Sequence, residues 1–505
     1  MPMKSNNNWT QSRRWLTGAA VTLTVFSGGQ TRNALTPPLP SGVNENFPVS
    51  LGQFSFQREN VLGTSFELLV GAVRADDARV CEQQVLAEIE RLRRILSTYD
   101  SSSEISRVRA GASVTSPELD FLLSTYGLWS QRTSGAINVN MAEVIRLWKE
   151  ARELPPAENA LAEAFLLPRA YNVDALGKGY IIDRAVEVAK RFAPSGLLNI
   201  GGDIRVWGGA AWPIGIADPF APAENAPLLG RFELRDGAVA TSGGYSRFVS
   251  LAGRRYSHII NPRTLQPVNL VSSASIVAAD CLTANALSTA ANVLGLDEGA
   301  AAAKLFGAWE YFLVDANGRI ASTAAMSAGV ADAHGASPLP KSAAGTPVAP
   351  VAAPAWPTNF QVNISLKFKA PAGGFARRPY VAVWVEDANK KLVRTISVWG
   401  TDFRYLRELS GWWQAADSYS DAFARTVTRA TRAPGNYSLV WDGLDDKKQP
   451  VPQGDYTIHM EINREHGRHL TESAAVKCGT KLQEAEIRAT SETDAGKIAY
   501  GPKTP

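Results

Sequence analysis

The side chains best suited to chemistry lie in seven short motifs between residues 97 and 290. Lys178, which stands between two glycines, can meet a phosphate as a point charge. Tyr99 offers an aromatic face on which a ring can stack, and residues 240–243 can place backbone N–H groups near a ligand. In chain order the motifs are Ser97-Thr98-Tyr99-Asp100 with Ser103-Glu104-Ile105-Ser106, Ser134-Gly135-Ala136, Ala175-Leu176-Gly177-Lys178-Gly179-Tyr180, Asn199-Ile200-Gly201-Gly202-Asp203, Ala240-Thr241-Ser242-Gly243, Ser257-His258-Ile259-Ile260-Asn261-Pro262-Arg263 and Ala286-Leu287-Ser288-Thr289-Ala290.

In this order the seven motifs resemble those of the ApbE family, the FAD:protein FMN transferases, over about residues 55–325. Enzymes of this family bind FAD and a divalent metal, split the pyrophosphate, and attach FMN to a Thr or Ser of another protein. The resemblance therefore implies a transferase that uses FAD as substrate, requires Mg²⁺ and modifies an acceptor flavoprotein of an envelope redox system. It implies catalytic roles for His258 and Lys178.

The resemblance also implies the metal ligands and the FAD contacts. The metal ligands would be the backbone carbonyl of Ala175 and the side chains of Asn285 and Thr289, which share one helix face because they are four residues apart. The motif Leu62-Gly63-Thr64 would contact the ring system, and residues 134–138 would cradle the adenosine. The positions that correspond to FAD contacts are Leu62, Tyr99, Ala136, Ile137, Asn138, Asn172, Lys178, Thr241, Ser242 and Ile259.

Four positions at which the family has Asp are Asn in this chain: Asn138, Asn172, Asn261 and Asn285. Asn keeps the size and hydrogen-bonding reach of Asp but not its charge. At position 285 this should weaken Mg²⁺, which prefers charged oxygen ligands. The sequence thus leaves two hypotheses open: an active transferase of a divergent subgroup, and a non-catalytic FAD-binding protein of the envelope.

The net charge argues against nucleic-acid binding, and the first residues of the chain predict export. The chain has 52 basic and 48 acidic residues and a net charge of +4, without the basic stripe that a nucleic-acid binder would show. Arg13 and Arg14 precede an apolar run at residues 16–26, which is too short to span a bilayer. This predicts a twin-arginine export signal, with an ordinary Sec signal as the alternative. We expect a periplasmic protein with no stable membrane span after signal removal.

The elements that must position the motifs indicate an α+β fold, because helices and strands alternate without a regular repeat. Helices are predicted at residues 76–96, 119–130, 144–150, 180–192, 284–294 and 298–306, with the Gly177-Lys178-Gly179 turn opening the helix at 180–192. Strands are predicted at residues 64–70 and 273–277. An Ala/Pro-rich stretch at residues 327–356 reads as a flexible linker.

Beyond the linker, segments such as 380–386 and 393–400 alternate apolar and polar residues, which predicts a small β-sandwich. This region resembles a DUF2271-type domain, and it could serve as a docking module. The predicted organisation is an export signal and start of a linker at 1–34, an ApbE-like flavin-transferase domain at 55–326, the linker at 327–356, the β-sandwich at 357–480 and a loose tail at 481–505.

Overall fold

The computed structural model describes residues 51–221, 226, 228–244, 248–251, 254–326, 354, 356–357, 359–369, 378–400, 406–416, 428–429, 431–432, 434–464 and 468–503. The chain divides into two compact units, one formed by residues 18–219 and 228–334 and the other by residues 335–505 with the short segments 1–17 and 220–227. The predicted export signal and most of the predicted linker lie outside the described residues.

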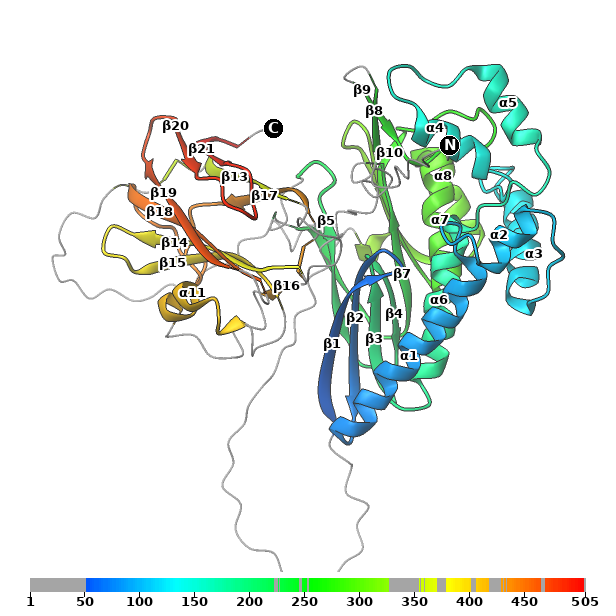
Figure 1. The fold of residues 1–505 in the computed structure, drawn as a ribbon, viewed down its shortest axis with the longest axis horizontal. Coiled ribbons are helices and arrows are strands. Elements are labelled where there is room, and N and C mark those ends of the chain that lie inside the picture. Colours follow the sequence, from blue (N-terminus) through cyan, green and yellow to red (C-terminus); the bar gives the residue numbers. More distant parts are fainter. Residues whose placement is uncertain are drawn as a thin grey trace, which may run out of the picture. The chain divides into compact units, whose positions relative to one another are not determined.

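The first unit is built on an eight-stranded sheet of order β1-β2-β3-β4-β7-β10-β11-β12, in which every pairing is antiparallel (Figure 1). An antiparallel sheet combined with separate helices is an α+β arrangement, which confirms the predicted fold class. The strands are β1 (Gly52–Val61), β2 (Thr64–Ala72), β3 (Ser195–Ile200), β4 (Asp203–Trp207), β7 (Gly237–Ser242), β10 (Val271–Ala278), β11 (Ala308–Asp315) and β12 (Ile320–Ser322).

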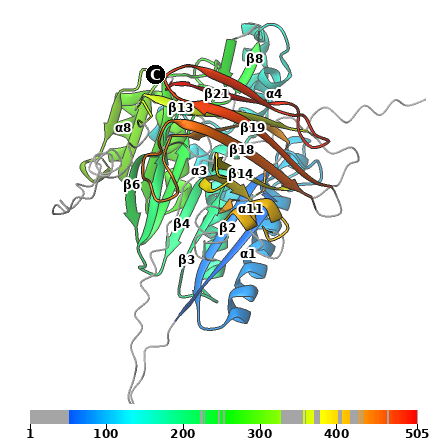
Figure 2. The ribbon, with the colours of Figure 1, turned by 90° about the vertical axis from the view of Figure 1, so that its left-hand side faces the viewer.

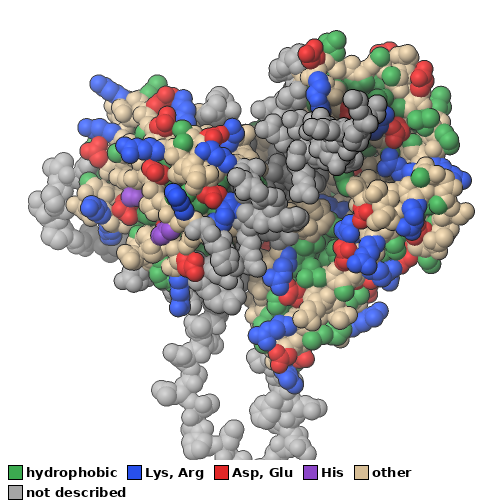
Figure 3. All heavy atoms as spheres, viewed as in Figure 1, with side chains coloured by type: hydrophobic (Ala, Val, Ile, Leu, Met, Phe, Trp, Pro, Cys, Tyr) green, Lys and Arg blue, Asp and Glu red, His purple; other side chains and the backbone are tan. Residues whose placement is uncertain are grey.

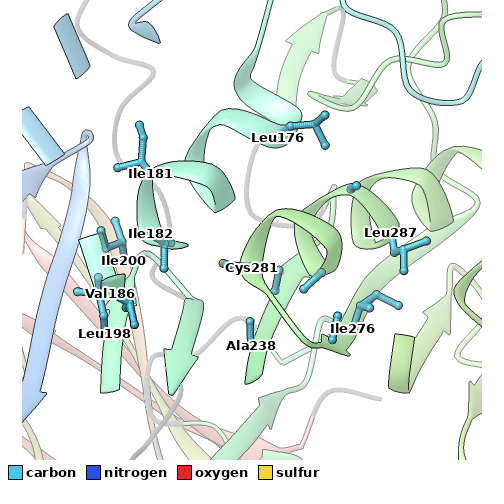
Figure 4. Packing of buried hydrophobic residues seen from close by; sticks show 14 of the residues in the cluster. Leu176, Ile181, Ile182, Val186, Leu198, Ile200, Ala238, Ile276, Cys281 and Leu287 are labelled. Atoms are coloured by element: carbon cyan, nitrogen blue, oxygen red, sulfur yellow. The ribbon is translucent and has the colours of Figure 1, made fainter. Parts of the chain in front are cut away.

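Helices cover one face of this sheet, and a two-stranded ribbon covers the other. The main core joins apolar residues of the helices to one face of the strands, and Figure 4 shows part of it around α6 and α7. A second cluster joins the opposite strand face to the ribbon β5–β6. The helices are α1 (Ala75–Leu96), α2 (Glu104–Arg109), α3 (Pro117–Arg132), α6 (Asp174–Ala189), α7 (Cys281–Leu294) and α8 (Leu296–Leu305); the ribbon is β5 (Trp212–Ala217) and β6 (Leu228–Leu234).

Helix α1 shows why the sequence pattern identified most helices correctly. Its apolar residues recur at three- and four-residue spacing, and Val85, Ile89 and Leu92 are all buried. Acidic residues lie in its first turn and basic residues in its last turn, which favours the helix dipole. The predicted helix at residues 76–96 is therefore confirmed.

A smaller layer completes the first unit. Helices α4 (Ala142–Glu150) and α5 (Glu158–Leu166) and the hairpin β8 (Phe248–Leu251) and β9 (Arg254–Ser257) surround a separate apolar cluster. Trp148 of α4 packs against Tyr256 of β9 with ring centroids 5.4 Å apart, and its indole N–H donates to the carbonyl of Leu265. This cluster fixes the segment that follows β9, which carries the motif containing His258.

The second unit is a β-sandwich, as predicted. One sheet has the order β17-β13-β21-β20 and the other β16-β15-β14-β18-β19, and strands of both are labelled in Figure 2. Their inner faces share one core. On the outer face of the second sheet, Trp412 of helix α11 packs with Trp384. The elements are β13 (Phe360–Phe368), β14 (Tyr380–Asp387), β15 (Leu392–Trp399), α11 (Ser410–Ala415), β16 (Thr428–Arg429), β17 (Gly435–Trp441), β18 (Gly454–Asn463), β19 (His469–Cys478), β20 (Gln483–Ile487) and β21 (Gly496–Pro502).

The prediction of a loose tail at residues 481–505 is wrong. Strand β21 lies between β13 and β20 in the first sheet of the sandwich. Ile498 and Tyr500 are 0% and 1% exposed, so this strand supplies part of the core. The charged residues Glu484, Glu486 and Lys497 of β20 and β21 are exposed, and such polar residues make the segment resemble a tail.

Positive and negative side chains are interspersed on the visible face of both units, as Figure 3 shows for the described residues. Within the described part of the chain, no helix is long and apolar enough to cross a membrane.

Candidate active site

A buried carboxylate joins two of the motifs to Asn285, the residue before a third. Asp203 is the first residue of β4, and its side chain is 1% exposed. One oxygen, Oδ2, lies 2.7 Å from the Lys178 ammonium and 2.6 Å from the amide nitrogen of Asn285, which donates to it. A carboxylate only accepts hydrogen bonds, so Asn285 must present its nitrogen to Asp203 and keep its oxygen for another partner. Sequence reasoning assigned no role to Asp203.

A turn that glycine alone suits holds Asp203 in place. Gly201 and Gly202 both adopt positive φ, at 59° and 92°, a region that L side chains rarely enter. The side chain of Asn199 accepts the Gly202 N–H, and a β-carbon on Gly201 would lie 2.6 Å from the side chain of Thr64. The turn of the Leu62-Gly63-Thr64 motif therefore packs directly on the turn that precedes Asp203.

The Gly177-Lys178-Gly179 segment lies inside α6 and does not form the predicted turn before a helix. Its second glycine permits close contact with α7, because a β-carbon on Gly179 would lie 2.5 Å from the carbonyl oxygen of Cys281. This contact places Lys178 of α6 and Asn285 of α7 on the same carboxylate.

Two aspartates hold the beginning of α7. Asp280 caps it by accepting the Thr283 N–H at 2.7 Å. Asp183 of α6 accepts the N–H groups of Cys281 and Leu282 at 2.8 and 2.9 Å. Burial raises the pKa of Asp183 to about 6, although these two donors oppose the shift. Within the described structure Asp280 therefore acts as a helix cap.

Hydroxyl groups connect the end of β7 to α7. Ser242 Oγ lies 2.9 Å from Ser288 Oγ and 3.5 Å from Thr289 Oγ1, and Asn292 donates to the Ser242 carbonyl at 3.0 Å. Thr241 on the preceding position instead pairs with Ser275 of β10 at 2.9 Å. The structure thus brings the predicted site residues Ser242 and Thr289 together.

Tyr126 fixes the first turn of α6, where the predicted ligand Ala175 lies. Its side chain is 1% exposed, and its hydroxyl accepts the Leu176 N–H at 3.2 Å. Burial raises the pKa of this phenol far above its usual value. Tyr126 lies on α3 among apolar residues, so its sequence context identifies only a core aromatic.

Asp174 accepts hydrogen bonds from Tyr99 and from polar residues near it. It accepts from Thr98 at 3.2 Å, from the Tyr99 hydroxyl at 3.4 Å and from the amide of Asn172 at 3.0 Å. The Tyr99 side chain remains 68% exposed, and the Lys149 ammonium lies 5.2 Å from its ring centroid. Tyr99 and Asn172, both predicted FAD contacts, therefore lie side by side.

The predicted adenosine contacts at residues 134–138 lie on a turn beside Arg263. Ser134 and Gly135 adopt positive φ, and a β-carbon on Gly135 would lie 3.8 Å from Arg263. After these two residues, Ala136 and Ile137 are buried, so their side chains belong to the core, and Asn138 follows them half-buried.

His258 is exposed, whereas the next residue, Ile259, is buried. A β-carbon on Gly244 would lie 2.6 Å from Ser257 Oγ, which places the beginning of the His258 motif beside the end of the motif at 240–243.

Two family models match this chain, one in each unit. Residues 62–313, about half of the chain, match the family model described as "ApbE family". These residues belong to the ApbE family. Residues 360–497 match the model described as "Predicted periplasmic protein (DUF2271)".

Curated relatives and solved structures of similar sequence cover the same region. A FAD:protein FMN transferase of Haemophilus influenzae is 27% identical over 47% of this chain and 80% of its own length. One from Treponema pallidum is 28% identical over 53% of this chain and 86% of its own length. The crystal structure of the ApbE protein of Thermotoga maritima is 25% identical with a TM-score of 0.49, and it covers 55% of this chain and 99% of that one.

The ligand types of the ApbE-like site suit a hard cation, but the charge distribution is unusual. A carbonyl, an amide oxygen and a hydroxyl are all oxygen ligands that Mg²⁺ accepts. None carries a charge, and the nearby carboxylate of Asp203 is already paired with Lys178. Among the described residues, no group of three or more His, Cys, Asp or Glu side chains could hold a metal. The residues therefore fit Mg²⁺ in ligand type, with weaker electrostatic attraction than a carboxylate would give.

Proposed function

We propose that this chain is an exported, Mg²⁺-dependent FAD:protein FMN transferase. The observation that carries the proposal is that Lys178 and Asn285 both contact the buried carboxylate of Asp203. In addition, the hydroxyl of Ser242, at the end of β7, lies 3.5 Å from that of Thr289 on α7, the helix that carries Asn285. The relatives with this activity in their names support the same reaction class.

The reaction is the attack of an acceptor hydroxyl on the FMN phosphorus of FAD. A new O–P bond forms between the acceptor Thr or Ser and that phosphorus, the bond to the AMP phosphate oxygen breaks, and AMP leaves. A bound Mg²⁺ would neutralise charge on the pyrophosphate, and its holders would be the Ala175 carbonyl, Asn285 and Thr289.

The chain's own residues would bind, orient and move protons. Lys178 would share its positive charge between Asp203 and the departing phosphate, while Tyr99 would stack on an aromatic ring of the dinucleotide. His258 is an exposed imidazole, the side chain most often used for proton transfer, and would take the proton of the acceptor hydroxyl.

The direct test is to incubate the full mature chain with FAD, Mg²⁺ and an acceptor protein that contains the family's flavinylation threonine. We expect AMP release by chromatography and an acceptor mass increase of one FMN. Lys178→Ala should lower the rate strongly. Lys190→Ala is the matched control because this exposed lysine follows the last residue of the same helix and pairs with Glu187 at the surface.

A second candidate function is a non-catalytic FAD-binding protein. It is favoured by one observation: the neutral Asn285 stands at the expected metal position and donates to Asp203. FAD binding without AMP release, at any Mg²⁺ concentration, would establish this second function and refute the first.

We also propose export to the periplasm by a twin-arginine signal and a docking role for the β-sandwich toward an acceptor of an envelope redox system. The description of the matching C-terminal family as periplasmic supports the location. Replacing Arg13 and Arg14 by lysine keeps the charge, so loss of periplasmic accumulation would identify the twin-arginine route. Undiminished accumulation would identify the Sec route.

A further inference from the structure

We propose that Asp203 is a positioning residue that sets how this site binds metal and phosphate, by holding Lys178 and orienting Asn285 through one oxygen. The inference rests on the proposed function for the identity of the ligands. It concerns a residue that is not among the expected contacts of the site.

The geometry leaves Asp203 little freedom. Its carboxylate is almost completely buried and follows a turn of two left-handed glycines. A buried carboxylate is stable only when it is paired and hydrogen-bonded. Lys178 and Asn285 supply these partners from two different helices, so Asp203 ties α6 and α7 to the beginning of β4.

Asparagine at position 285 makes this arrangement possible without a metal. Its amide N–H donates to Asp203, whereas a carboxylate in the same place would have no proton to donate and would put two negative groups in contact. The negative charge of the site therefore lies at position 203, beside Lys178, and not at position 285. We infer that this chain uses Asp203 to hold the lysine and gives up charge at the metal position.

The experiment exchanges donor and acceptor. In the double variant D203N/N285D, an amide at 203 can donate to a carboxylate at 285, so the composition and net charge are unchanged while the charge moves to the metal position. The single variants D203N and N285D separate the two changes. Titration calorimetry of the full chain gives the Kd for Mg²⁺, and FAD binding is measured separately without metal.

We expect the double variant and N285D to bind Mg²⁺ roughly tenfold or more tightly than the parent chain, since charged ligands raise the affinity of hard-cation sites. D203N should bind Mg²⁺ more weakly and metal-free FAD more tightly, because Lys178 would lose its competing carboxylate. A purely structural role for Asp203 would instead weaken both ligands in D203N. Equal Mg²⁺ affinity in all four proteins, or weakened FAD binding in D203N, would overturn the inference.

Asp315 provides a matched control. It is buried at 7% exposure, and its carboxylate accepts N–H groups from the backbone of Asn317 and Arg319. D315N should lower the melting temperature but leave the Mg²⁺ affinity unchanged. If D203N does not fold, N285D alone decides, because it must bind Mg²⁺ more tightly than the parent chain. These readouts need no turnover, so absence of AMP release would refute the proposed function without deciding this inference.

Discussion

The two glycines that flank Lys178 should respond in opposite ways to alanine. Both lie inside α6, where alanine is favoured over glycine by about 1 kcal/mol. A β-carbon on Gly177 would make an ordinary contact, 3.5 Å from Val173. A β-carbon on Gly179 would lie 2.5 Å from the Cys281 carbonyl oxygen and 2.8 Å from the Leu282 Cα. These are backbone atoms, which can move only if the two helices separate.

The expected magnitudes follow from these distances. Overpacking a buried contact costs about 1–3 kcal/mol, with the upper end expected where backbone atoms must move. After the gain in helix propensity, G179A should lose about 2 kcal/mol of stability, and G177A should gain about 0.5–1 kcal/mol. The difference between the two variants is therefore about 3 kcal/mol.

Hydrogen exchange of peptides from α6 and α7, measured by mass spectrometry, reports this stability difference for the two helices separately from the second unit. G179A should lose protection in both helices and bind FAD more weakly, since Lys178 and Asn285 would separate. G177A should keep or gain protection. Equal protection in the two variants would show that close contact between α6 and α7 is not required, and the argument would fail.

Three further predictions test groups that the sequence motifs did not reveal. Y126F removes the acceptor of the Leu176 N–H, so unfolding should require about 1–3 kcal/mol less and Mg²⁺ affinity should fall. The folded pKa of Asp183, about 6, lies above its ordinary 3.8, so its contribution to stability is full below pH 4 and is lost as pH rises through 6. Urea unfolding should show a loss of at most about 3 kcal/mol over this range. The D183N variant should flatten this dependence of stability on pH. In the second unit, Glu461 is 0% exposed, and its carboxylate accepts the backbone N–H of Trp412 at 2.9 Å. E461Q removes the negative charge of this acceptor, so hydrogen exchange of residues 410–416 should rise while FAD binding stays unchanged.

Periodicity and turn residues were sufficient to predict most elements, as in α1, which buries a regular apolar stripe. They failed where tertiary contacts decide. A glycine pair inside an otherwise helical pattern resembles a turn, but Gly179 is required by a neighbouring helix that lies about 100 residues later in the sequence. The strands at residues 483–502 contain few apolar residues. They become part of a core because β21 pairs with β13 and β20 pairs with β21.

The site was predictable to the level of which motifs assemble, but not to the level of which atoms pair. Ser242, predicted to contact FAD, and Thr289, predicted to bind the metal, lie 3.5 Å apart at their hydroxyls. Asp203 was not identified, because its significance depends on Lys178 and Asn285, which approach it from separate helices. The packing of α6 against α7 brings these two partners to Asp203, and the sequence alone does not show that packing.

The four Asn residues that replace Asp fall into two classes, according to whether the amide nitrogen donates to a carboxylate. The Asn172 oxygen also accepts the backbone N–H of Asp174 at 3.1 Å. At Asn285 and Asn172, the amide nitrogen donates to a carboxylate, that of Asp203 at 2.6 Å and that of Asp174 at 3.0 Å. An aspartate could not make either bond. At Asn138 and Asn261, the side-chain oxygen accepts a backbone N–H two residues later, at 2.8 and 2.9 Å. An aspartate would make these bonds equally well.

Substitution by aspartate should therefore separate the two classes in the metal-free protein. N285D places two carboxylates in contact in a buried site and should cost about 1–3 kcal/mol; N172D, which is more exposed, should cost less than about 1 kcal/mol. The other two, N138D and N261D, keep their bonds and should stay within about 0.5 kcal/mol of the parent chain. Added Mg²⁺ should restore N285D selectively, because a cation at the metal position offsets the new charge. Melting temperatures of the four variants with and without Mg²⁺ test this ranking, and an N138D or N261D variant less stable than N285D would contradict it.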